Sequence, residues 1–332
     1  MIAARLYGPY DIRVEDIPRP LARDEWVVLE VKAVGICGTD KAFYKGTYKL
    51  FKKPIVLGHE ICGVVIDVGK NVPKDIVGQL FVSEINIVCN KCWFCTHDLS
   101  THCPYREVLG ITIDGGMAQY VTVPYRNLHR VELDPEIAIF VEPLAAVLQM
   151  IKLAPIKPGL NVAILGSGTI GILSIQVLKM FAPNNLVVIT RPNSPKARYA
   201  KMFGADYVVS YDEALELKKR ITPEGQGFDY VVEATGDPKG LDLAIELTRP
   251  RGIVAAKSTH GLPTTFNYTL TVVKEISIIT SRCGPFKPAI RLLGEEKVRV
   301  KELITSRYRL TKAEEAFRRS LGRDQIKVVL KP

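Results

Sequence analysis

Four cysteines stand close together in the chain, at spacings that suit the ligands of a single metal ion. They form the pattern C-x2-C-x2-C-x7-C, and its members are Cys89, Cys92, Cys95 and Cys103. Zinc prefers four tetrahedral ligands, and four thiolates make a closed site that leaves no room for a substrate. Such a site stabilises a loop rather than doing chemistry. The spacing therefore predicts a structural zinc site, with His97 and His102 inside the loop as alternative ligands.

Three further segments carry potential metal ligands. Cys37 lies in G-I-C-G-T-D, His59 and Glu60 lie in G-H-E, and Glu142 lies in V-E-P-L. Each is a weak signal alone, because a single cysteine is usually a small core residue. Three mixed ligands from separate loops, however, are typical of an open zinc site whose fourth position takes water or an alcohol.

A glycine-rich segment indicates nucleotide binding. It reads G-S-G-T-I-G and consists of Gly166, Ser167, Gly168, Thr169, Ile170 and Gly171. The pattern is weak by itself, but here it follows an expected strand, Val162–Leu165, and opens a helical pattern. Glycine lets the backbone approach a pyrophosphate, and the helix N-terminus faces the anion. The alternative is a simple glycine-rich turn.

Arg191 indicates which nicotinamide cofactor is used. It follows the next expected strand, Leu186–Thr190, at a point where an acid normally binds the ribose of NAD. A guanidinium suits a 2′-phosphate and offers no acceptor to a 2′-hydroxyl. Nearby polar residues are Ser194, Lys196 and Arg198. We therefore predict that NADP is preferred and NAD possible, unless a shifted strand end brings Thr190 or Asn193 to the ribose instead.

The elements that must position these residues fall into two groups. The first 140 or so residues are β-rich, with short runs such as Trp26–Val31 and Gly63–Val68. From about Asn161, short apolar strands alternate with amphipathic helices. The expected strands are Val162–Leu165, Leu186–Thr190, Tyr207–Ser210, Tyr230–Glu233, Gly252–Ala256 and Ile276–Thr280. Such alternation predicts a parallel sheet with helices on both faces.

Length and composition limit the possible classes of protein. The 332 residues suffice for two domains. The net charge of +10 fits a solvated surface better than a nucleic-acid site, since the basic residues are spread along the chain. An odd count of seven cysteines favours metal over a disulfide framework. Without a long apolar run or a signal-peptide pattern, we expect a cytoplasmic protein with no membrane or nucleic-acid partner.

In this order, the motifs G-I-C-G-T-D, G-H-E, the four-cysteine pattern, E-P-L and G-S-G-T-I-G resemble the zinc-containing medium-chain dehydrogenase/reductase family. The resemblance covers nearly the whole chain and implies an α/β protein. It implies a GroES-like β-rich catalytic domain at 1–145, completed by 285–332, and a Rossmann domain with a doubly wound parallel sheet at 146–284. It also implies a homodimer or a homotetramer.

The resemblance assigns roles to particular residues. Cys37 and His59 match catalytic zinc ligands, and Glu142 matches the third. Glu60 matches a residue that binds zinc directly in some members and supports the site in others. Thr39 matches a proton-relay hydroxyl, although Ala42 stands where many members continue the relay with a histidine. Glu233-Ala234-Thr235-Gly236 resembles a loop beside the cofactor, which adds Thr235 to the cofactor-binding set.

The function implied is that of a zinc-dependent NAD(P) alcohol dehydrogenase acting on a small alcohol, aldehyde or ketone. A polyol or sugar dehydrogenase is the alternative, favoured by Glu142, Ala42 and the segment Ser281–Phe286. A basic zinc-ribbon protein that binds nucleic acid would leave Cys37, His59 and the glycine segment unexplained. A zinc-free quinone reductase is disfavoured by the intact set of ligands.

Overall fold

The computed structural model describes all 332 residues, which form two compact units. The first unit consists of Met1–Glu142 together with Phe286–Pro332, and the second consists of Pro143–Pro285. None of the helices is long and apolar enough to span a bilayer.

The second unit is built on a six-stranded parallel sheet in the order β13-β12-β11-β14-β15-β16. Its strands are β11 (Asn161–Leu165), β12 (Asn185–Ile189), β13 (Tyr207–Val209), β14 (Phe228–Glu233), β15 (Thr248–Ala256) and β16 (Ser277–Thr280). All five residues of β11 are buried, as befits a strand at the centre of a sheet covered on both faces. This is the Rossmann order: successive strands are added on one side of β11 as far as β13, and then on its other side from β14 to β16. The predicted fold class is confirmed.

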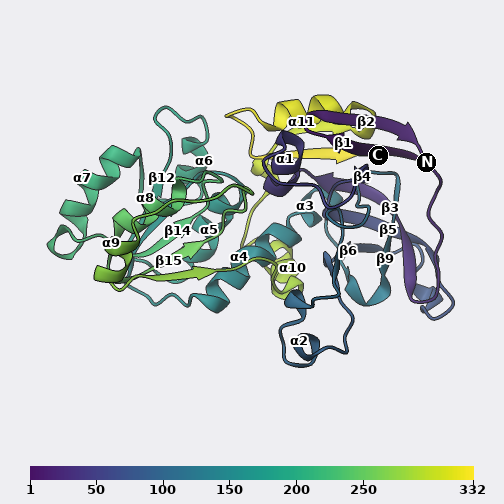
Figure 1. The fold of residues 1–332 in the computed structure, drawn as a ribbon, viewed down its shortest axis with the longest axis horizontal. Helices are drawn as coiled ribbons and strands as arrows, with labels where there is room; N and C mark the ends of the chain where they lie inside the picture. The colour runs from purple at the N-terminus through teal and green to yellow at the C-terminus, as the bar shows by residue number, and fades with distance from the viewer. The chain divides into compact units, whose positions relative to one another are not determined.

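Helix α4 precedes the first strand of this unit, and the other helices connect successive strands (Figure 1). The helices are α4 (Val141–Leu153), which starts two residues before the unit does, α5 (Thr169–Lys179), α6 (Ala197–Met202), α7 (Tyr211–Ile221), η4 (Pro223–Gly225), α8 (Gly240–Leu247) and α9 (Tyr268–Val273). Local sequence sets their ends. The Ser210 hydroxyl accepts from the Glu213 amide and the Glu213 carboxylate accepts from the Ser210 amide, which forms a capping box at the start of α7.

The first unit is organised around a seven-stranded sheet, β10-β6-β5-β3-β18-β17, with β9 also paired to β3. Smaller sheets join β2-β1-β4 and β7-β8. The strands are β1 (Ile2–Gly8), β2 (Asp11–Asp16), β3 (Trp26–Gly35), β4 (Ile55–Val56), β5 (Glu60–Val68), β6 (Leu80–Ser83), β7 (Asn86–Ile87), β8 (Glu107–Val108), β9 (Tyr120–Pro124), β10 (Leu128–Arg130), β17 (Ile304–Arg309) and β18 (Lys327–Lys331). This is the GroES-like domain of the predicted fold class.

Helices in this unit are short. They are α1 (Gly38–Lys45), α2 (Trp93–Thr96), α3 (Pro135–Ala138), α10 (Phe286–Gly294) and α11 (Ala313–Ser320), with 3-10 turns η1 (Lys74–Ile76), η2 (Ser100–His102), η3 (Tyr125–Asn127), η5 (Lys301–Leu303) and η6 (Leu310–Lys312). Figure 1 shows the last strand of the chain, in yellow, among the purple N-terminal strands. There β18 pairs with β3, Val329 opposite Gly35, so the last strand of the chain completes a sheet begun by N-terminal residues.

Candidate functional site

The four-cysteine loop folds into a cluster of sulfur atoms. The Sγ–Sγ distances are 3.5 Å between Cys92 and Cys95, 3.6 Å between Cys89 and Cys103, 3.8 Å between Cys92 and Cys103, and 4.0 Å between Cys89 and Cys95. Four sulfurs at tetrahedral corners, each bonded to zinc at its usual length, stand about 3.8 Å apart. The cluster therefore has about the dimensions of a four-thiolate zinc site.

Two short helical turns, α2 and η2, bring the four thiols together. Cys92 precedes α2 and Cys103 follows η2, so two short turns fold the loop back on itself, away from the main sheet (Figure 1). Backbone N–H groups of Lys91 and Cys92 lower the pKa of Cys89 to about 6, which favours its thiolate. The His97 ring instead stacks on Trp93 at 4.4 Å between ring centroids. The cysteines alone thus form the ligand cluster.

Cys37 and His59 meet in the first unit. Cys37 lies between β3 and α1, while His59 directly precedes β5, and the two side chains are close enough to interact electrostatically. Behind them, Asp40 is fully buried and its Oδ2 accepts a hydrogen bond of 2.8 Å from the Cys37 backbone amide. Its other oxygen, Oδ1, stands 3.7 Å from Nδ1 of His59. Asp40 therefore fixes the backbone at Cys37 and faces the ring of His59.

The electrostatics of this cluster suit a cation. Burial lowers the pKa of His59, but Asp40 and Cys37 more than offset this and, with Glu142, hold it well above its usual value. The facing atoms Nδ1 of His59 and Oδ1 of Asp40 are both buried without a hydrogen-bond partner. Thiolate, imidazole and carboxylate are also the donors that zinc accepts. Cys37 and His59, with the carboxylates nearby, thus offer donors of the kind that zinc binds, while the four-cysteine cluster is the one place where three or more potential ligand atoms already stand together.

Glu60 forms a salt bridge with a residue near the C-terminus of the chain. Its Oε2 accepts a hydrogen bond from Nζ of Lys327, and both side chains are only 1% exposed. Lys327 lies on β18 and Glu60 on β5, and the two strands flank β3. At that point β3 carries Gly35, where a Cβ atom would stand 2.2 Å from Oε2 of Glu60. Because Gly35 has no side chain, the space above β3 is free for the Glu60–Lys327 ion pair, which links the strands on either side of β3.

The remaining catalytic candidates are less completely buried. Glu142 is the second residue of α4 and half-buried, and its charge contributes to raising the pKa of His59. Thr39 lies in the first turn of α1, two residues after Cys37, and is half-buried.

In the second unit, each glycine of the glycine-rich segment has a separate structural reason. Gly166 has φ +104°, a left-handed conformation in which its amide donates to the Ile189 carbonyl at 2.9 Å. A Cβ on Gly171 would stand 1.9 Å from the Gly166 carbonyl oxygen, so the helix packs directly on the turn. A Cβ on Gly168 would meet nothing within 4 Å, at the very N-terminus of α5. That open position is where a dinucleotide-binding turn admits the pyrophosphate.

The end of β12 differs from the expected boundary. The strand ends at Ile189, so Thr190 lies just beyond it and its hydroxyl is 2.9 Å from that of Ser167. This hydroxyl pair ties the second strand to the glycine-rich segment. Arg191 follows and is exposed, and the half-buried Lys196 directly precedes α6.

The loop after β14 is closed by one carboxylate. Oε1 of the buried Glu233 accepts hydrogen bonds from the Thr235 amide and hydroxyl, at 2.9 and 2.6 Å, and from the Ser258 hydroxyl at 2.8 Å. The Thr235 hydroxyl is thus used within the loop. Thr235 itself is exposed at the carboxyl end of the sheet, where its loop can meet a ligand.

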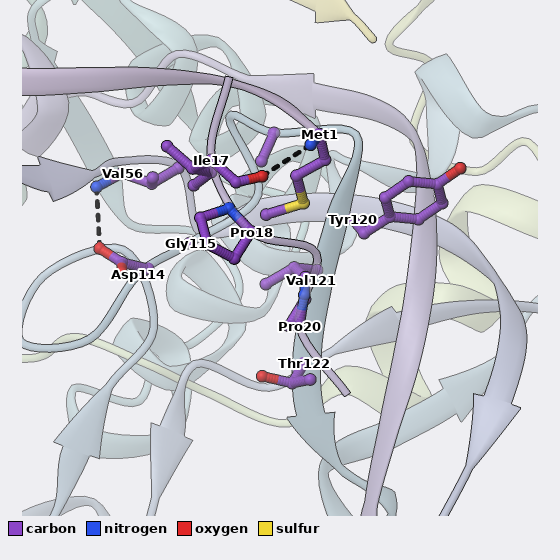
Figure 2. Close-up of a pocket in the computed structure, with 11 residues that line it drawn as sticks. Met1, Ile17, Pro18, Pro20, Val56, Asp114, Gly115, Tyr120, Val121 and Thr122 are labelled. Carbon is purple, nitrogen blue, oxygen red and sulfur yellow. Dashed lines mark hydrogen bonds between the residues drawn. The ribbon is translucent and has the colours of Figure 1, made fainter. Parts of the chain in front are cut away.

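A pocket in the first unit is shown in Figure 2. Its lining is mostly apolar and consists of Met1, Ile17, Pro18, Pro20, Val56, Asp114, Gly115, Ala118, Tyr120, Val121 and Thr122. Asp114, its one carboxylate, accepts from the Val56 amide at 3.0 Å and pairs with Lys52 at 2.9 Å. With that carboxylate already engaged and no candidate ligand in its lining, the pocket is not the reaction site.

Comparison with known proteins agrees with both units. Residues 23–133 match the family model described as alcohol dehydrogenase GroES-like domain, and residues 169–295 match the one described as zinc-binding dehydrogenase. A sorbitol dehydrogenase from Halalkalibacterium halodurans is 32% identical to this chain, over 98% of this chain and 97% of that protein. The chain belongs to the zinc-containing medium-chain dehydrogenase/reductase family. It is a zinc-dependent NAD(P) oxidoreductase, as the motifs predicted.

Other members of the family differ in their named substrates. A D-arabitol-phosphate dehydrogenase from Enterococcus avium is 31% identical over 95% of this chain and 92% of its own length. An L-threonine 3-dehydrogenase from Pyrococcus horikoshii is also 31% identical, over 94% and 91%. Among solved structures, a zinc-binding dehydrogenase from Sinorhizobium meliloti 1021, bound to NADP, has a TM-score of 0.89 at 28% identity and covers 100% of this chain and 99% of its own.

Sequence reasoning missed Lys327 as a partner of Glu60 and did not place Asp40 beside His59. A lysine inside the apolar run Ile326–Leu330 was the available signal, because lysine is almost never fully buried unless it is paired. Nothing in the sequence showed that its partner lies 267 residues away.

The first prediction concerns the cysteine cluster. Metal analysis should find about two zinc ions per chain, one for each kind of site. Cys92→Ser should lower the zinc content by about one ion and lower the unfolding temperature, because metal binding stabilises the loop. Cys62→Ala, which changes a buried cysteine outside both sets, should keep the full zinc content. A Cys92→Ser protein with unchanged zinc content would contradict the assignment.

The second prediction concerns the buried ion pair. Lys327→Met leaves the Glu60 carboxylate buried without its partner, and breaking such a pair costs about 3–5 kcal/mol. The double variant Glu60→Gln, Lys327→Met removes both charges and should recover much of that loss. Urea unfolding measures both variants. Equal destabilisation in the single and double variants would show that packing, and not charge, holds the strands together here.

Proposed function

We propose that this protein is a polyol or sugar dehydrogenase, which oxidises a hydroxyl group of a polyhydroxylated substrate with NAD(P) and reduces the corresponding carbonyl in reverse. The observation that carries the proposal is the Cys37–His59 pair, backed by the buried Asp40. The names of the relatives support a polyol substrate better than a simple alcohol. The absence of a histidine at Ala42 and the acid at Glu142 support the same choice.

Cys37, His59 and Glu142 are the proposed ligands of the catalytic zinc, and Cys89, Cys92, Cys95 and Cys103 are those of the structural zinc. When bound, the catalytic zinc makes a substrate hydroxyl acidic enough to ionise near neutral pH. Glu60 is held by Lys327 and is assigned to support of the site, since its Oε2 is already hydrogen-bonded. Oδ1 of Asp40 faces Nδ1 of His59 at 3.7 Å, on the side where metal-binding histidines usually have a carboxylate partner.

The glycine-rich segment 166–171 is the proposed pyrophosphate site, since it combines the open position at Gly168 with the N-terminus of α5. The nicotinamide supplies the hydride-accepting ring. Thr190, Arg191 and Lys196 are assigned to the adenosine ribose, and Thr235 to the loop beside the cofactor. In this scheme residues 1–145 with 285–332 bind the metal and 146–284 bind the dinucleotide.

Cellular context and assembly complete the proposal. None of the seven cysteines forms a disulfide, and clustered cysteines without disulfides suit a reducing compartment such as the cytoplasm. A homodimer or homotetramer is proposed from family membership alone, and the molar mass in solution tests it.

The third prediction tests the substrate class. The purified zinc-loaded protein, offered NAD or NADP with a panel of sorbitol, arabitol, their phosphates, L-threonine and ethanol, should turn over polyols with the highest kcat/KM. Neighbouring hydroxyls give a polyol more hydrogen bonds than ethanol can make, and a site that hydrogen-bonds a substrate hydroxyl rejects analogues lacking it. Higher efficiency with ethanol or L-threonine would overturn the polyol assignment and leave the family unaffected.

The fourth prediction concerns proton transfer. Thr39 is the proposed first member of the relay that carries the substrate's proton away. Thr39→Val keeps the side chain's shape and removes the hydroxyl, and loss of a general acid–base step lowers turnover by about 10²–10⁴-fold. Thr39→Ser, which retains a hydroxyl, is the control and should keep most activity. If the valine variant turned over normally, the proton would leave by another route.

The fifth prediction concerns cofactor choice. A charge-assisted hydrogen bond from Arg191 to a 2′-phosphate is worth about 1.5–3 kcal/mol, which is roughly 10- to 150-fold in favour of NADP. Arg191→Asp should invert the ratio of kcat/KM values for NADP and NAD. Arg251→Asp makes the same charge change at a well-exposed arginine at the other end of the sheet, within β15, and should leave the ratio alone. Equal use of both cofactors by the unmutated protein would refute the role of Arg191.

A further inference from the structure

Lys257 makes an unusual set of hydrogen bonds at the carboxyl end of β15. Its Nζ donates to the Ser281 carbonyl oxygen at 2.8 Å, to the Ser281 hydroxyl at 2.9 Å and to the Ala146 carbonyl oxygen at 3.0 Å. An ammonium group has three N–H donors, so the number of acceptors matches the number of donors. One side chain thus joins the ends of β15 and β16 to helix α4.

The segment that follows β16 is also packed directly on α4. A Cβ on Gly284 would stand 2.0 Å from the Ala145 carbonyl oxygen and 2.8 Å from Cβ of Gln149. The backbone at Gly284 therefore lies against the helix with no space for a side chain. Hydrogen bonds from Lys257 hold Ser281, at one end of the segment 281–284, and close packing on α4 holds Gly284 at the other end.

These contacts lie in the half of the sheet that does not bind adenosine. In a doubly wound sheet a ligand binds outside the carboxyl ends of the strands, and the adenosine ribose meets the end of the second strand, here β12. The other half of a dinucleotide therefore belongs to β14, β15 and β16. The Lys257 amide donates to the Glu233 carbonyl at 2.8 Å, and the neighbouring Ser258 bonds to the Glu233 side chain. Lys257 thus adjoins the loop after β14 as well as the end of β16.

We propose that Lys257 is a positioning residue for the nicotinamide half of the cofactor site. It acts through the segment 281–284, which it holds at the carboxyl end of the sheet, and makes no contact with reacting atoms. The proposal rests on the use of NAD(P) by this unit. A segment that is already fastened loses little conformational freedom when the ligand binds, and such preorganisation increases affinity.

The chain contains a matched control for this lysine. Nζ of Lys274 donates to three backbone carbonyls, at 2.8 Å to Thr248, 3.2 Å to Glu246 and 3.5 Å to Ile245. Thr248 is the first residue of β15, so this second lysine fastens the amino end of the same strand. The two lysines make similar bonds in one unit, and only Lys257 lies at the end where ligands bind.

The test compares the whole cofactor with its adenosine half. The full-length zinc-loaded protein is titrated calorimetrically with NADPH and with 2′-phospho-ADP-ribose, and then with NADH and ADP-ribose. Lys257→Met should weaken binding of the reduced cofactor about tenfold, in line with the loss of hydrogen bonds to a charged group, and leave the ADP-ribose fragment within about twofold. Ser281→Ala removes one of the three acceptors and should give a smaller loss of the same kind. Lys274→Met should change the two ligands equally.

Other outcomes would overturn the proposal. Equal weakening of cofactor and fragment in Lys257→Met would make the lysine a general stabiliser of the unit, and no weakening would remove it from the site. If Lys257→Met did not fold, Ser281→Ala would decide by the same comparison. Failure of the unmutated protein to bind NADPH or NADH would instead refute the nucleotide site itself, which separates the two hypotheses.

Discussion

A buried pair of opposite charges joins the two strands that flank β3 in the first unit. Lys327 and Glu60 are both almost completely removed from water, so each is stable there only because the other is present. Their contact links the last strand of the chain to β5 across Gly35, two residues before Cys37. The strands that carry Cys37 and His59 are therefore linked through β18, the last strand in the sequence.

Both candidate sites place reactive groups on short loops at the ends of rigid strands. Cys37 follows β3, His59 precedes β5, and the glycine-rich segment follows β11. The strands fix the backbone, and a few buried acids fix the loops. Asp40 holds the loop of Cys37, and Glu233 closes the loop of Thr235. This division lets members of one family keep the scaffold while their substrates differ, as the sorbitol, arabitol-phosphate and threonine dehydrogenases do.

Ligand motifs and strands could be predicted from the sequence because they depend on residues close together in the chain. The cysteine spacing predicted a cluster that the structure contains, and the glycine-rich segment predicted a strand, a turn and a helix in that order. The parallel sheet followed from the alternation of strands and helices. The end of β12 was set one residue too far, because the β-branched Thr190 suits a strand and its amide still bonds to Val209, although the regular strand ends at Ile189.

Contacts between distant residues were decided only by the tertiary structure. Glu60 could have been a metal ligand or a supporting residue by sequence, and Lys327 became its partner only when β18 was placed beside β3. Asp40 likewise acquired its place behind His59 from the pairing of β3 with β5. The sequence by itself determined which donors the chain offers, because residue types and local spacing carry that information. The pairing of buried charges depends on which strands become neighbours, and only the folded sheet determines that.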